Sequence, residues 1–81
     1  MINMVVKPDV NGKWVVQEAD GGNGRVILSS TSQGYDRLAR AEEMARRVAP
    51  RGDEVVNLVI KDADGKVKRR EVLHDPGAAA Q

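Results

Sequence analysis

The sequence predicts an α+β domain in which an antiparallel sheet packs against one helix, in the element order β-β-β-α-β-β. Short runs near both ends of the chain alternate apolar and polar residues, which is the period of a half-buried strand. Between them, residues 38–48 repeat apolar residues every three to four positions, which is the period of a helix. Clusters of Gly, Asn, Asp and Pro separate these runs and indicate turns.

Length and composition limit the classes of protein to consider. The chain has 81 residues, of which 41% are hydrophobic and 31% charged, as is typical of one small folded domain. We expect residues 1–76 to form that domain and residues 77–81 to be a flexible tail. The absence of cysteine excludes disulfides and cysteine-held zinc. No apolar run is long enough to span a membrane and the N-terminus does not resemble a signal peptide, so we expect a cytoplasmic protein without a membrane partner.

Three strands are expected before the helix, forming an antiparallel meander. They are residues 2–7, 13–17 and 25–29. Ile2, Met4 and Val6 stand at every second position, so they share one face of the first strand. Trp14, in the second strand, is one of only two aromatic residues, and we expect it to anchor the core beneath the helix.

The helix expected over residues 38–48 has a single apolar stripe. That stripe is Leu38, Ala41, Met44 or Ala45, and Val48. Asp36 precedes the helix, and we expect its carboxylate to accept hydrogen bonds from the free N–H groups of the first turn. Pro50 and Gly52 are expected to end the helix.

A C-terminal hairpin follows, with strands at residues 54–61 and 66–73 and a turn at residues 62–65. Asp62, Asp64 and Glu71 match part of a calcium-binding loop. The first ligand position of that loop is occupied by Ile60, which cannot bind a hard cation. We therefore expect an ordinary hairpin turn and no metal.

Several short segments resemble a bacterial family. The first is Gly12-Lys13-Trp14, followed by Asn23-Gly24-Arg25-Val26-Ile27-Leu28-Ser29-Ser30, Gly34-Tyr35 and a short helix. This frame resembles the YegP-like proteins, and Leu58-Val59-Ile60, Asp64-Gly65-Lys66-Val67 and Asp75-Pro76 resemble a related family of small bacterial domains. Together they cover roughly residues 10–76 of the chain. The resemblance implies a three-stranded meander with a helix across it and no catalytic site. Because YegP-like proteins often hold two such units, it also implies that a homodimer supplies the missing half.

Basic residues of the second half are the best candidate site. They are Lys66, Lys68 and Arg70 on the returning strand, with Arg46 and Arg47 near the end of the helix. A strand pair with a basic stripe can follow nucleic-acid phosphates or enter a major groove. However, the net charge is only +1, and basic residues on an edge strand also commonly prevent aggregation.

The sequence shows no nucleophile beside a base and no paired acid and base at a readable spacing, so we expect no enzyme and no cofactor. The small aliphatic core favours self-association, because cores of this size are marginally stable. We therefore expect a non-catalytic protein-interaction module of bacterial or phage type, homodimeric, with a host or cellular protein as its other partner. The alternative is a nucleic-acid-binding module that uses the basic hairpin.

Overall fold

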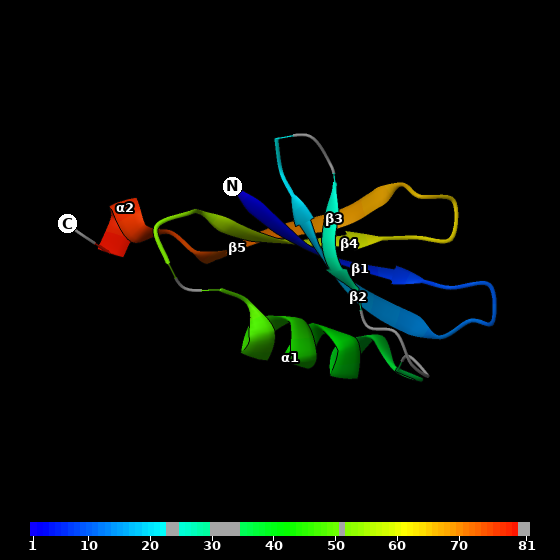
Figure 1. Ribbon diagram of the computed structural model, residues 1–81. Coiled ribbons are helices and arrows are strands. Elements are labelled where there is room, and N and C mark those ends of the chain that lie inside the picture. Colours follow the sequence, from blue (N-terminus) through cyan, green and yellow to red (C-terminus); the bar gives the residue numbers. More distant parts are fainter. Residues whose placement is uncertain (23–24, 30–34, 51, 80–81) are drawn as a thin grey trace.

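The computed structural model describes residues 1–22, 25–29, 35–50 and 52–79, and for residues 26–29, 78 and 79 it describes the backbone only. The elements are β1 (Ile2–Pro8), β2 (Trp14–Asp20), β3 (Val26–Ser29), α1 (Leu38–Val48), β4 (Val56–Lys61), β5 (Val67–His74) and α2 (Pro76–Ala79). The strands form one sheet, and α1 lies across one of its faces (Figure 1). The predicted α+β class, with one principal helix on a sheet, is confirmed.

The sheet is mixed, with strand order β3-β2-β1-β4-β5. β1 lies at its centre, antiparallel to β2 and parallel to β4. The predicted antiparallel pairings of β1 with β2, of β2 with β3 and of β4 with β5 are present, but the expectation of a wholly antiparallel sheet with a separate hairpin is wrong. The physical reason is the connection through α1: because β3 and β4 both run parallel to β1, the helix serves as a crossover that joins the two halves into one sheet.

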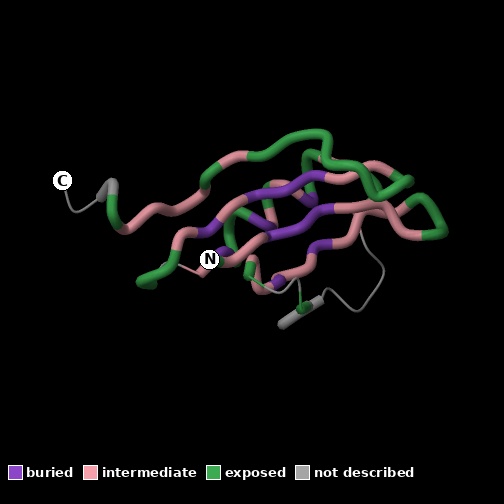
Figure 2. Tube along the Cα trace, turned by 90° about the horizontal axis from the view of Figure 1, so that it is seen from above, coloured by how far each residue is buried: buried purple, intermediate pink, exposed green. Residues whose placement is uncertain are grey.

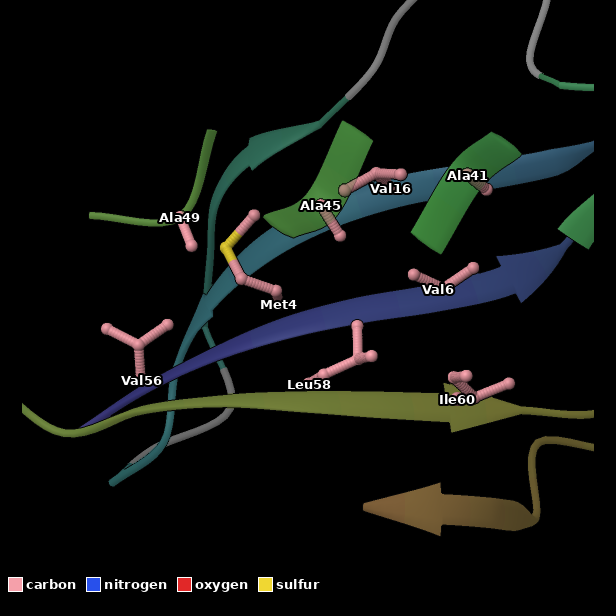
Figure 3. Close-up of a cluster of buried hydrophobic side chains, with 9 residues drawn as sticks. All are labelled: Met4, Val6, Val16, Ala41, Ala45, Ala49, Val56, Leu58 and Ile60. Carbon is pink, nitrogen blue, oxygen red and sulfur yellow. The ribbon is translucent and has the colours of Figure 1, made fainter. Parts of the chain in front are cut away.

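The main core lies between α1 and the sheet. Its buried members are Met4, Val6, Val16, Ala41, Ala45, Ala49, Val56, Leu58 and Ile60 (Figure 3). The parallel register places Met4 beside Leu58, and Ile2 and Trp14 are partly buried against the same cluster. The predicted common face of Ile2, Met4 and Val6 is thus confirmed. Trp14 packs at the margin of this core.

The contact face of α1 consists mainly of alanine. Ala41 and Ala45 are fully buried, and their small side chains let the helix backbone approach β1 and β2 closely. The predicted stripe is wrong at Val48, whose side chain is 56% exposed. Val48 is the last residue of α1, and it is Ala49, the C-cap residue that follows it, that is buried in the core.

The start of α1 also differs from the prediction. Arg37 is the N-cap residue and provides no side-chain cap. The Asp36 carboxylate instead pairs with the Lys13 ammonium, which comes from the neighbouring end of β2. Two backbone hydrogen bonds fix this approach, because the Trp14 N–H donates to the Tyr35 carbonyl at 2.7 Å and the Tyr35 N–H donates to the Trp14 carbonyl at 2.8 Å.

The turn between β4 and β5 forms as predicted. The Asp62 N–H donates to the Lys66 carbonyl at 2.9 Å, and the Asp62 side chain accepts from the Asp64 and Lys66 N–H groups, each at 2.9 Å. Gly65 has a φ of 83°, which favours glycine at this position. The four-residue helix α2 covers part of the segment predicted as a tail. Neither α1 nor α2 is long and apolar enough to cross a membrane.

Candidate interaction surfaces

The two faces of the sheet have different surroundings. α1 covers one face, here called the helix face, whereas no helix or loop among the described residues packs on the opposite face (Figure 1). We call this opposite surface the open face. Figure 2 views it from the side away from α1. Val5, Ala19 and Val59 form a small buried cluster at its centre.

The pairing register defines which strand residues share the open face. They are Asn3, Val5 and Lys7 of β1; Val15, Gln17 and Ala19 of β2; Asn57, Val59 and Lys61 of β4; and Val67, Arg70 and Val72 of β5. This set contains three basic residues and no carboxylate. Much of the set lines a shallow hollow of about 340 Å³, at one end of which the Asp20 carboxylate accepts a hydrogen bond from the Gly22 N–H at 2.7 Å.

Lys7, Lys61 and Arg70 form what we call the cationic cluster, and all three line that hollow. Val6 of β1 pairs with Ile60 of β4, and Lys7 and Lys61 are the next residues along these two parallel strands. Their backbones therefore lie about 5 Å apart. Arg70 stands opposite Val59, on the next strand. Within the described part of the chain, none of the three makes an ion pair. Neighbouring like charges on a sheet repel one another, so this arrangement suits an anionic ligand.

Charge on the other side of the molecule is compensated. Its ion pairs are Lys13–Asp36, Arg40–Glu43, Arg46–Glu71, Arg47–Glu43 and Arg69–Glu42. The hydrogen bond from Arg46 holds the pKa of Glu71 below its ordinary value, and the hydrogen bond from Lys13 does the same for the pKa of Asp36. Among the described residues, these ion pairs thus lie on the side of α1, whereas Lys7, Lys61 and Arg70 on the open face make none.

The structure divides the predicted basic site between these surfaces. Arg46 pairs with Glu71 and Arg47 with Glu43, both on the side of α1. Arg70 lies on the open face. The remaining two belong to the hairpin: Lys66 lies in the turn before β5, and Lys68 is the extra residue where the pairing register shifts.

Two members of the cationic cluster, Lys7 and Lys61, are missing from the predicted site. Alternation along each strand places Lys7 opposite the core-facing residues, but only the parallel pairing of β1 with β4 brings it beside Lys61. That pairing joins residues more than fifty positions apart in the sequence. No local pattern indicates it.

β5 provides a second candidate surface, the β5 edge. In the described sheet it pairs only with β4, so the backbone groups on its other side have no strand partner. Val67 is 42% exposed and Val72 is 59% exposed, and both lie on the open face of this strand. An edge of this kind can pair with another strand.

Among the described residues there is no group of three His, Asp or Glu side chains that could hold a metal ion. The single histidine, His74, has its Nε2 atom 3.0 Å from the Gly52 carbonyl oxygen. No family model, curated protein or solved structure matches this chain. The resemblance to YegP-like proteins therefore stays a prediction.

Proposed function

We propose that this chain is a small, non-catalytic protein-interaction module that forms a homodimer through the β5 edge. The observation that carries the proposal is an eight-residue edge strand with open backbone groups and two exposed valines. Antiparallel addition of a second β5 would satisfy those groups and bury part of the valine surface. For a core as small as this one, such pairing would also add stability.

Charge restricts where the two edges can pair. Centring the two-fold axis on Arg70 would place two guanidinium groups directly opposite each other, which is unfavourable. Centring it on Val72 instead brings valine against valine near the end of the strand. We therefore place the dimer axis at Val72.

The test compares two valines of similar exposure. Val72, at 59% exposed, lies on the β5 edge, whereas Val48, at 56% exposed, lies on α1. Sedimentation equilibrium of the unmodified chain should show a monomer–dimer equilibrium. Val72→Lys should raise the dissociation constant at least about tenfold, the equivalent of about 1.4 kcal/mol, while Val48→Lys should leave it unchanged.

Circular dichroism of both variants checks that the fold is retained. A chain that stays monomeric at the highest soluble concentration would overturn the proposal. Equal weakening by the two lysine variants would also overturn it, because the effect would then not belong to the β5 edge.

A second candidate function is nucleic-acid binding. The observation in its favour is the separation of charge between the two sheet faces, since the hollow on the open face is lined by three basic residues, which make no ion pair among the described residues, and by one carboxylate, that of Asp20. The residues concerned differ from the basic hairpin that the sequence suggested.

A further inference from the structure

We propose that the cationic cluster on the open face is a binding site for the phosphate backbone of double-helical nucleic acid. The site consists of Lys7, Lys61 and Arg70 and does not depend on whether the β5 edge forms a dimer. Its ligand chemistry is a row of phosphodiester anions, and its contacts do not read the base sequence.

The first argument is charge complementarity. Three cations from three adjacent strands line one hollow, whose lining includes a single carboxylate, that of Asp20. Their mutual repulsion is not relieved by any ion pair among the described residues. A row of phosphate groups placed over these cations would relieve that repulsion. Binding would also release the counterions that accompany those phosphates.

The second argument concerns the rigidity of the strands that carry the three basic side chains. Lys7, Lys61 and Arg70 stand on β1, β4 and β5, which belong to one hydrogen-bonded sheet. Beside them on the same face, Val5 of β1 and Val59 of β4 are buried together and pack these two strands against each other. The long basic side chains can therefore reach outward from a rigid base, as repeated backbone contacts require.

The third argument separates a double helix from a single strand. Proteins that hold single strands stack the bases on aromatic side chains. Trp14 and Tyr35 are the only aromatic residues of the chain, and both pack against the core on the helix face. The open face thus offers phosphate contacts without a stacking platform, which suits a duplex whose bases remain paired.

Salt dependence gives this proposal a numerical expectation. Each phosphate neutralised on duplex DNA contributes about −0.9 to the slope of log affinity against log salt concentration. Three contacts therefore predict a slope of about −2.7 per protein chain, with weak affinity that is the same for unrelated sequences.

The experiment measures fluorescence anisotropy of a labelled DNA duplex, in two unrelated sequences, over a series of salt concentrations. Lys7→Gln, Lys61→Gln and Arg70→Gln should each reduce the slope by about 0.9, and the triple variant should lose at least about tenfold in affinity at low salt. The matched control is Arg40→Gln, which removes a basic residue that is ion-paired with Glu43 on α1. It should leave both the slope and the affinity unchanged.

Titrations with other polyanions in the same assay identify the class of ligand. Comparable binding of duplex DNA and duplex RNA supports a backbone site, and preference for one of them identifies the source of the duplex. No binding at low salt, or binding that the triple variant retains, would overturn the proposal. Tighter binding of a single strand, or equal binding of polyglutamate, would overturn it as well and point to a different anionic partner.

Discussion

The helix face and the open face of the same sheet differ in both packing and charge. Beneath α1, apolar residues form the main core and basic residues are paired with carboxylates. On the open face, a small apolar cluster lies beside Lys7, Lys61 and Arg70, which make no ion pair with the described residues. A net charge of +1 therefore conceals a locally basic hollow, because Lys7, Lys61 and Arg70 gather there whereas Arg40, Arg46, Arg47 and Arg69 are paired with carboxylates on the other side. The difference teaches that the distribution of charge, rather than its sum, indicates the kind of partner.

The largest expected effect compares two neighbouring valines of β1. Val6 is buried on the helix face and Val5 on the open face. Val6→Ala should lower the free energy of unfolding by about 2–3 kcal/mol, because it removes apolar contacts and leaves a cavity in the main core. Val5→Ala should cost about 1 kcal/mol, since water can reach the space it leaves.

Urea unfolding followed by circular dichroism measures both values. Equal losses would show that the two faces contribute alike to stability, and the distinction between a structural face and a binding face would fail.

A smaller effect concerns the dependence of stability on pH. Because the hydrogen bond from Arg46 lowers the pKa of Glu71 in the folded protein, the ionised carboxylate stabilises the fold at neutral pH. That stabilisation is lost as the pH falls through the lowered pKa. Glu71→Gln should therefore be less stable than the unmodified chain at neutral pH, and the gap should close in acid.

Urea midpoints measured across the acid range test this expectation. Asp53→Asn is the control, because Asp53 is exposed and makes no ion pair among the described residues. A gap between Glu71→Gln and the unmodified chain that stays constant with pH would contradict the role of the Arg46 pair.

The smallest expected effect has the opposite sign. Lys61→Gln removes one member of the cationic cluster and so relieves repulsion with Lys7. We expect it to stabilise the fold by a few tenths of a kcal/mol, and the gain should disappear at high salt. A loss of stability measured by thermal unfolding at low salt would show that Lys61 makes a favourable contact instead.

Local patterns in the sequence predicted part of this structure and part of the candidate site. Alternation placed Ile2, Met4 and Val6 on the core side because the side-chain period of a strand is two, and the turn at residues 62–65 followed from its Asp and Gly residues. The prediction that Asp36 caps α1 was wrong because Lys13, the residue before β2, pairs with its carboxylate.

Long-range pairing explains what could not be predicted. The parallel contact of β1 with β4 depends on the path of the chain through α1, and no short motif encodes that path. It is also the contact that brings Lys7 beside Lys61. Arg46 was included in the predicted binding site because the sequence does not show its ion pair with Glu71, which lies on a strand distant in the sequence.

The position of the β5 edge relative to the open face determines the valency of the proposed module. A two-fold axis perpendicular to the sheet at Val72 would leave both open faces on the same side of the dimer. One duplex could then contact two cationic clusters, and the second contact would form at the high effective concentration of a tethered site. The expected salt slope doubles to about −5.4 without any additional residue. Protein concentration, through dimerisation, would then control how tightly the duplex is held.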